Sequence, residues 1–380
     1  MVQQTPLRVL ISCGEPSGEF YGAELVTELR KRVPDLEVFG LGGDRLASEN
    51  VHLLAHLKDL AVVGLVEVLS HLRRLKGLFD SVVHDAARLR PNVAVLIDYP
   101  DFNLRLARKL KQLGIPVVYY VSPQLWAWRR GRIKDVKRDV AKMLVIFPFE
   151  EQIYRDAAVP VAFVGHPLID HVHPPADRAL VARRLGLDPS RPVVALLPGS
   201  RNKEVAFNLP PILGGVELLR QTRPELQFVL AAAPHLRSGA FRGAEGAGVA
   251  IVRDATRDVL SAARAAIVAS GTATVETALT RTPMVVVYRI SGLTYALGKP
   301  LVNLTNYAMV NLIAGRTVVT ELIQKDFTKE RVAAETLRLL DDGPPRSAML
   351  KDLDEVREKL GKGGATVLAA DQLMEFLRPS

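Results

Sequence analysis

The residues VAVLIDYPDFN at positions 93–103 decide the fold class. Five apolar residues in a row, Val93 to Ile97, are typical of a strand in a parallel sheet that helices cover on both faces. The turn Asp98 to Pro100 follows, and residues 102–113 have apolar side chains at helical spacing. Strand, turn and helix in this order predict one step of a doubly wound α/β domain.

The same strand-and-helix pattern recurs along the 380 residues in two sets. The first set has apolar runs at 8–12, 93–97, 117–121, 143–146 and 161–164, and the second at 193–197, 227–231, 249–252, 265–269 and 284–288. A short polar, proline-rich connection, Asp170 to Pro175, lies between the sets. We therefore predict two doubly wound α/β domains facing each other across a cleft, residues 1–168 and 169–345. Residues 346–380 are expected to be helices that pack back on the first domain.

Composition excludes several classes of protein. Hydrophobic residues make up 48% and charged residues 24% of the chain, which excludes disordered, collagen-like and disulfide-scaffold proteins. The single cysteine, Cys13, can form no internal disulfide, so a reducing cytosol fits best. The apolar run Val9 to Cys13 is too short for a signal peptide, and no run approaches the ~18 uncharged apolar residues of a membrane span. The net charge of +9 favours an anionic partner.

Ligands of open parallel sheets bind beyond the carboxyl ends of the strands, so the loops there carry the candidate sites. Residues 13–19, CGEPSGE, are glycine-rich, but Glu15 and Glu19 would repel a phosphate, which indicates a substrate with hydroxyl groups. The alternative is a plain turn with Ser17 as helix cap. Asp98 could take a proton from an incoming hydroxyl or serve as a buried structural acid. Asp101 is expected to cap the following helix.

Two loops of the second set suit a nucleotide. In PGSR, residues 198–201, Gly199 permits close backbone approach, Ser200 supplies a hydroxyl and Arg201 offers a fork of donors for a diphosphate. In SGTATVE, residues 270–276, small residues open a helix whose N–H groups suit a phosphate, and Glu276 could accept both hydroxyls of a ribose. The alternative for both loops is an ordinary capped helix start. We assign the nucleotide to the second domain and the acceptor to the first.

A strongly basic segment follows two tryptophans. Residues 129–142 contain seven basic and two acidic residues, a balance of +5, and Trp126 and Trp128 stand just before them. This combination suits an anionic lipid surface, and the alternative is a solvated basic helix with both tryptophans in the core. No nucleic-acid-binding module accompanies the segment, so we expect no nucleic-acid partner. His171 and His173 lack a third ligand nearby, so we expect no metal site.

Several motifs in a fixed order give the chain an extensive resemblance to the lipid-A-disaccharide synthase family, nucleotide-sugar glycosyltransferases of the two-Rossmann GT-B type. The motifs are GEPSG at 14–18, VGLVEVL at 63–69, residues 97–103, residues 121–132, FPFE at 147–150, residues 163–170, residues 197–201, residues 269–276 and NLIAG at 311–315. Each motif alone is weak, but this many in family order over most of the chain is highly specific.

The resemblance implies transfer of 2,3-diacylglucosamine from its UDP derivative to 2,3-diacylglucosamine 1-phosphate. The product would be a β-1,6 disaccharide, formed by a metal-independent inverting displacement without a cofactor. It also implies a peripheral protein on the cytoplasmic face of the inner membrane, with a homodimer as one expected state.

The site residues that we expect fall into three groups. The catalytic candidates are Asp98 and its rival Glu15. The nucleotide-binding candidates are Gly199, Ser200, Arg201, Ser270, Gly271, Thr272, Ala273, Thr274, Glu276 and Asn311. The candidates for contact with the acceptor or the membrane are Ser17, Asn103, Trp126, Trp128, Arg129 and Arg132.

The chain departs from the family pattern at three places. Glu19 replaces a usual Asp, Met309-Val310 replace a usual Leu-Pro, and Thr320 replaces a usual Pro. Two alternatives share the architecture: a UDP-sugar epimerase and another GT-B transferase. A non-catalytic two-lobed sugar or nucleotide binder is a third, but a periplasmic binder should carry the export signal that we do not find.

Overall fold

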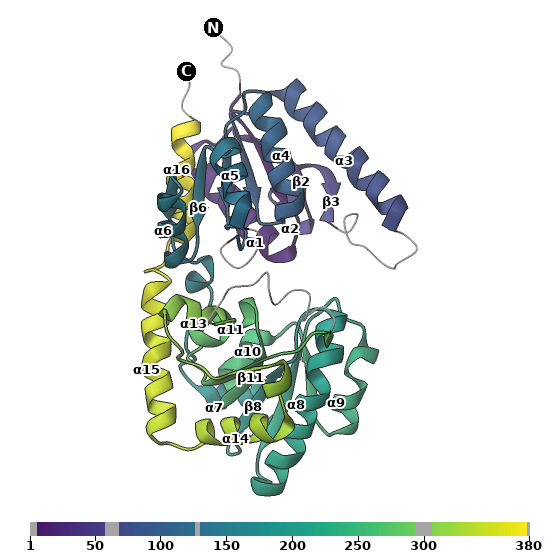
Figure 1. Ribbon diagram of the computed structural model, residues 1–380, viewed down its shortest axis with the longest axis vertical. Helices are drawn as coiled ribbons and strands as arrows, with labels where there is room; N and C mark the ends of the chain where they lie inside the picture. Colours follow the sequence, from purple (N-terminus) through teal and green to yellow (C-terminus); the bar gives the residue numbers. More distant parts are fainter. Residues whose placement is uncertain (1–5, 58–67, 126–129, 293–305, 378–380) are drawn as a thin grey trace. The chain divides into compact units, whose positions relative to one another are not determined.

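The computed structural model describes residues 6–57, 68–125, 130–292 and 306–377. The chain forms two compact units, one of Met1–Pro167 with Lys362–Ser380 and one of Leu168–Gly361. Each unit contains one parallel sheet flanked by helices (Figure 1). The predicted doubly wound α/β fold is therefore confirmed for both halves of the chain.

The first unit has a seven-stranded sheet in the order β3-β2-β1-β4-β5-β6-β7. Its strands are β1 (Arg8–Cys13), β2 (Glu37–Gly42), β3 (His52–His56), β4 (Val93–Ile97), β5 (Val117–Tyr120), β6 (Lys142–Val145) and β7 (Val161–Phe163). The strand order reverses between β1 and β4. The helix that follows β1 packs on one face of the sheet and the helix that follows β4 on the other, and doubly wound domains bind their ligands at such a point.

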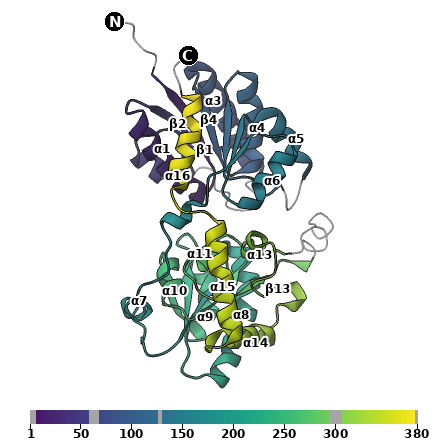
Figure 2. The same ribbon diagram turned by 90° about the vertical axis from the view of Figure 1, so that its left-hand side faces the viewer.

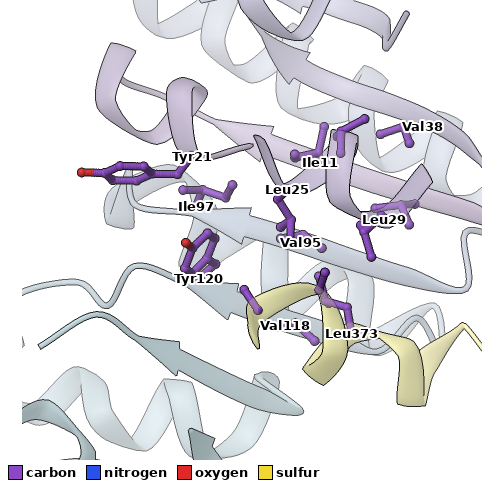
Figure 3. Close-up of a cluster of buried hydrophobic side chains, with 14 of the residues drawn as sticks. Ile11, Tyr21, Leu25, Leu29, Val38, Val95, Ile97, Val118, Tyr120 and Leu373 are labelled. Carbon is purple, nitrogen blue, oxygen red and sulfur yellow. The ribbon is translucent and has the colours of Figure 1, made fainter. Parts of the chain in front are cut away.

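Helices cover both faces of this sheet. They are α1 (Pro16–Arg32), α2 (Asp44–Ser48), α3 (Val68–Leu89), α4 (Pro100–Gln112), α5 (Ile133–Asp139), α6 (Pro148–Asp156) and α16 (Ala365–Leu373). Figure 3 shows Leu25 and Leu29 of α1 and Leu373 of α16 against one face of the sheet, where Ile11 and Val95 project. The strand residues next to Ile11 and Val95 in sequence point to the other face of the sheet. There they belong to a second apolar cluster, which includes side chains of α4 and α5. Two buried faces explain why the central strand β4 is apolar and buried at every position.

The second unit has a six-stranded sheet in the order β10-β9-β8-β11-β12-β13. The strands are β8 (Val193–Leu197), β9 (Gln227–Ala232), β10 (Ala250–Arg253), β11 (Ala265–Ala269), β12 (Met284–Tyr288) and β13 (Glu321–Ile323). The helices are α7 (Arg178–Arg184), α8 (Asn202–Thr222), α9 (Arg242–Gly246), α10 (Thr256–Ala262), α11 (Thr272–Leu279), α13 (Met309–Ala314), α14 (Lys329–Leu340) and α15 (Pro344–Lys359). Here the strand order reverses between β8 and β11.

The C-terminal segment divides between the two units (Figure 2). We expected all of residues 346–380 on the first domain, but α15 belongs to the second unit, where it buries Met349, Leu353 and Val356. Only the chain from Lys362 onward joins the first unit, through α16 beside α1. Gly361, Gly363 and Gly364 have φ of 117°, 93° and 72° between the two helices. This glycine-rich break is the sequence signal that marks the boundary.

No helix in the described ranges is long and apolar enough to span a bilayer. The longest helix of the first unit, α3, carries basic and acidic residues among its apolar ones.

The loops after β1 and β4 interlock at the carboxyl edge of the first sheet. The ring of Tyr99 lies over Gly14, where an added Cβ would be 2.0 Å from its Cγ. Tyr99 also stacks on Phe102 with ring centroids 5.6 Å apart. Burial is the main cause that raises the pKa of Tyr99, and the nearby charges of Asp101 and Glu15 raise it further. Only glycine permits this approach, which brings Glu15 close to the turn that carries Asp98.

Replacing Gly14 should therefore damage the first unit. Gly14→Ala forces either Tyr99 off Phe102 or the loop backbone aside, and overpacking of this kind lowers the free energy of unfolding by about 1–3 kcal/mol. Urea unfolding measures the effect. The control is Gly77→Ala in α3, where an added Cβ meets nothing within 4 Å, so stability should stay the same or rise by up to ~1 kcal/mol. Equal stability of Gly14→Ala and the unaltered protein would contradict the interlock.

Candidate functional site

Asp98 stands at the end of β4 in a strained turn. Asp98 and Tyr99 have φ of 49° and 50°, in the left-handed region, which costs on the order of 1 kcal/mol for each non-glycine residue. The carbonyl oxygen of Asp98 accepts hydrogen bonds from Asn103 Nδ2 at 2.8 Å and from the Tyr119 hydroxyl at 2.6 Å. The Asp98 side chain is half-buried. Strain held in place by buried partners is a recurring feature of functional sites.

Asn103 lies beneath this turn rather than at the surface. It is fully buried, and its Nδ2 also donates to the carbonyls of Ile97 and Ser12, while its Oδ1 accepts from Ser12 Oγ at 2.7 Å. We expected Asn103 to contact the acceptor or the membrane. In the structure the Asn103 side chain instead links the ends of β1 and β4 to the start of α4 through these hydrogen bonds.

The other polar residues of this edge are more exposed. Glu15 precedes α1 in extended conformation and makes no side-chain capping bond, and Ser17 is exposed in the first turn. Asp101 does not cap α4, because the helix begins at Pro100 after Tyr99. The carboxylate of Asp101 instead pairs with Arg132 at 2.5 Å.

This ion pair brings η2 (Arg130–Arg132) to the same edge of the sheet as Asp98. Trp126, Trp128 and Arg129 lie outside the described residues.

Glu19 has a structural role. Its buried carboxylate accepts hydrogen bonds from the N–H groups of Arg45 at 2.8 Å and Leu46 at 3.3 Å, in the first turn of α2. A Cβ at Gly43 would be 2.7 Å from this carboxylate. Glu19, where the family usually has Asp, thus reaches across to α2, which explains how the chain accommodates this departure.

Burial, followed by the charges of Glu19 and Asp98, raises the pKa of the Cys13 thiol.

The loop after β8 uses two of its backbone N–H groups internally. The N–H groups of Ser200 and Arg201 both donate to Oε2 of Glu204, at 3.0 and 3.3 Å. Gly199 has a φ of 129°, and a Cβ there would be 2.6 Å from that of Glu204. The Arg201 guanidinium pairs with Glu204 Oε1 at 3.0 Å but remains 67% exposed. A ligand at this loop could therefore bind the Arg201 guanidinium, whereas the N–H groups of Ser200 and Arg201 are already occupied.

The loop after β11 offers a helix start to a ligand. Gly271 and Thr272 are exposed at the beginning of α11, whose first N–H groups have no acceptor within the helix. Thr274 is fully buried, and its hydroxyl donates to the carbonyl of Gly271 at 2.8 Å, so it shapes the turn. Ser270 donates its hydroxyl to the carbonyl of Tyr307 at 3.0 Å.

Glu276 lies on α11, one turn further into the helix than this start. Burial raises the pKa of Glu276, and Arg257, at 3.5 Å, opposes the shift.

Asn311 is fully buried and bonded on every side. Its Nδ2 donates to the carbonyl of Val319 at 3.0 Å and to Glu321 at 2.7 Å, and its Oδ1 accepts from the N–H groups of Val318 and Val319. Glu321 also accepts from the N–H groups of Tyr307 and Ala308 at the start of α13. With these partners in place, Asn311 has no hydrogen-bonding capacity left for a nucleotide.

The remaining departures from the family pattern fit this local structure. Met309 and Val310 are the first two residues of α13, positions that accept proline or any other residue because their N–H groups need no partner in the helix. Thr320 donates its hydroxyl to Glu335 at 3.2 Å, a contact that a proline could not make.

The described residues contain no group of three or more His, Cys, Asp or Glu side chains placed to hold a metal ion. His173 Nδ1 instead lies 3.2 Å from the Arg357 guanidinium. His166 is buried against Tyr21 and Phe147, with ring centroids at 6.2 and 5.3 Å, and burial lowers its pKa to about 3.

Sequence reasoning missed the residues that hold these loops from below: Tyr119, Glu204 as a backbone acceptor, Asn208 and Glu321. Asn208 is fully buried in α8, donates to the carbonyl of Pro198 at 2.9 Å and accepts from the N–H of Arg289 at 2.8 Å. A signal was present, because Asn208 occupies a position on a helix face that is otherwise apolar.

Comparisons with known proteins give the family and the fold of the chain. A family model described as lipid-A-disaccharide synthetase matches residues 9–369. Lipid-A-disaccharide synthase of Koribacter versatilis (strain Ellin345) is 50% identical over 372 residues, which cover 96% of each chain. The protein of the same name from Myxococcus xanthus (strain DK1622) is 45% identical over 377 residues and 98% of each chain.

Solved structures share the fold at low sequence identity. UDP-GlcNAc 2-epimerase from Neisseria meningitidis bound to UDP-GlcNAc matches with a TM-score of 0.65 and 12% identity over 97% of this chain and all of that one. Medicago truncatula UGT71G1 complexed with UDP-glucose matches with a TM-score of 0.60 and 16% identity over 99% of each chain. The fold is therefore that of GT-B glycosyltransferases. With the family model matching almost its whole length, the chain belongs to the lipid-A-disaccharide synthetase family, glycosyltransferases of lipid A biosynthesis.

Proposed function

We propose that the protein transfers 2,3-diacylglucosamine from UDP-2,3-diacylglucosamine to 2,3-diacylglucosamine 1-phosphate. The products would be the β-1,6-linked disaccharide 1-phosphate and UDP. The observation that carries this proposal is the strained acidic turn at Asp98, held by buried partners in a chain of this family. A carboxylate fixed at a strand end suits the removal of a proton from an acceptor hydroxyl.

UDP would bind the second unit. The exposed Arg201 guanidinium and the N–H groups at the start of α11, from Gly271 to Ala273, would bind the diphosphate. Glu276 would accept the ribose hydroxyls, since it lies on the same helix as the proposed phosphate site. Gly199, Ser200, Ser270, Thr274 and Asn311 would shape the pocket from behind through the hydrogen bonds already described.

The reaction would be a single displacement with inversion at the sugar carbon. Asp98 takes the proton of the acceptor 6-hydroxyl, and that oxygen forms a bond to the anomeric carbon of the donor. The bond from this carbon to the diphosphate oxygen breaks, and its electron pair leaves with UDP. Arg201 and the positive end of α11 stabilise the negative charge that grows on the diphosphate.

The base assignment predicts a selective loss in Asp98→Asn. Positioned proton transfer contributes about 10²–10⁴-fold, so turnover should fall by about that factor, while UDP affinity and thermal stability stay close to those of the unaltered protein. Steady-state conversion of the UDP-sugar measures turnover. Glu15→Gln is the rival variant. Turnover within about threefold of normal in Asp98→Asn, with a large loss in Glu15→Gln, would move the role to Glu15.

The nucleotide assignment predicts weaker UDP binding in Arg201→Ala. A hydrogen bond to a charged group contributes roughly 1.5–3 kcal/mol, and calorimetry with UDP measures the loss. Arg338→Ala is a matched control, because both arginines pair with a glutamate three residues away at 3.0 Å and are similarly exposed, at 67% and 60%. Arg338 lies on α14, outside the loops after β8 and β11. Equal UDP affinity in both variants would contradict the assignment.

We further propose peripheral attachment to the cytoplasmic face of the inner membrane through the basic segment. In α5, Val136 is buried in the core, whereas Lys134 and Lys137 are exposed. Ion pairs engage Arg132, Arg138 and Lys142. No ion pair among the described residues engages Lys134 or Lys137, so both charges are available to anionic lipid.

Vesicle binding tests this attachment. Each lysine near an anionic surface contributes about 1 kcal/mol, so reversing Lys134 and Lys137 together to Glu should weaken binding to anionic vesicles at least about tenfold. Rising salt should weaken binding of the unaltered protein. The control reverses Lys109 and Lys111, two exposed lysines of α4. Binding that ignores salt and lipid charge, or equal losses in both double variants, would argue against the proposal.

A further inference from the structure

The hydroxyl of Tyr119 reaches the backbone of the proposed base. Tyr119 lies on β5, paired in register with Leu96 of β4, and its side chain is fully buried. Its hydroxyl donates to the carbonyl oxygen of Asp98 at 2.6 Å. Burial, followed by the charge of Asp98, holds the pKa of Tyr119 well above its usual value. The hydroxyl therefore keeps its proton and stays a donor.

This hydrogen bond acts on the peptide group that sets the direction of the Asp98 side chain. Asp98 and Tyr99 are both left-handed, so the peptide between them is turned away from its usual orientation. Two side chains from different elements hold its carbonyl oxygen, Tyr119 from β5 and Asn103 from α4. An unsupported turn of this kind would relax toward a right-handed conformation and redirect the carboxylate.

Tyr119 differs from Asn103 in the number of other groups to which its side chain is hydrogen-bonded. Asn103 also bonds Ser12 and Ile97, so its replacement would disturb β1 as well. Among the described residues, the bond to Asp98 is the only one that the structure gives the Tyr119 hydroxyl. Removing this one oxygen therefore changes the support of Asp98 and leaves the ring in the core.

We propose that Tyr119 is a positioning residue, whose hydroxyl fixes the Asp98 turn so that the carboxylate meets the acceptor hydroxyl. This inference rests on the proposed role of Asp98 as base. A misplacement of about 1 Å in a reacting group can lower the rate about 10²-fold. We therefore expect Tyr119→Phe to lower kcat about 10- to 100-fold.

The test separates positioning from stability. In Tyr119→Phe the KM of both substrates and the affinity for UDP should stay within about twofold of normal, because no binding group changes. Tyr154→Phe is the matched control: Tyr154 is buried in the same apolar cluster, and its hydroxyl bonds Ser122 Oγ at 2.8 Å rather than Asp98. It should lose comparable thermal stability but keep its kcat. Equal kcat losses in the two variants, or a kcat in Tyr119→Phe within about twofold of normal, would overturn the proposal.

A double variant separates this proposal from the assignment of the base. Asn at position 98 keeps the carbonyl that Tyr119 holds but lacks the carboxylate. Adding Tyr119→Phe to Asp98→Asn should therefore cost no more than about twofold in kcat beyond Asp98→Asn alone. A further loss as large as that of the single Tyr119 variant would show that Tyr119 acts elsewhere and would overturn the proposal. If Asp98→Asn alone keeps its turnover, the base assignment fails, and the positioning role fails with it.

Discussion

Fully buried asparagine side chains hold the strand-end loops in both units, and the arrangement of the site depends on them. Asn103 joins the ends of β1 and β4, and Asn208 joins the loop after β8 to the chain after β12. Asn311 joins α13 to the segment before β13. Loops at the ends of buried strands carry backbone groups that need partners, and each group left without one costs about 1–3 kcal/mol. The amides meet this need without a charge.

These anchors leave different chemistry exposed on the two units. On the first unit, Glu15 and the Asp98 turn place carboxylates where the loops after β1 and β4 interlock. On the second unit, Arg201 and the start of α11 present positive charge. The neighbouring N–H groups of Ser200 and Arg201 donate to Glu204. Acids that can accept a proton and donors that can bind a diphosphate are the two requirements of transfer from a nucleotide sugar. The glycosyltransferase assignment of the family is consistent with this division.

The fold could be predicted from the sequence because central strands of both sheets are apolar at every position, as in Val93–Ile97. The position of the candidate loops at the carboxyl ends of the strands could also be predicted, where ligands of this fold bind. Individual roles could not. Asp101 looked like a helix cap, but α4 begins at Pro100, two residues earlier than expected, and this leaves Asp101 for Arg132. Asn103 and Asn311 looked like ligand contacts, yet their amides are used inside the fold, and only coordinates show which polar side chains point inward.

The fold is shared by proteins of different chemistry, since the structural neighbours include UDP-GlcNAc 2-epimerase as well as glycosyltransferases. An epimerase changes one sugar, whereas a transferase joins two. The most direct measurement is mass spectrometry of the products from UDP-2,3-diacylglucosamine, incubated with and without 2,3-diacylglucosamine 1-phosphate. We expect a disaccharide with a single phosphate and an equal amount of UDP, formed only when both substrates are present. An altered or hydrolysed donor sugar, formed equally without the acceptor, would contradict it.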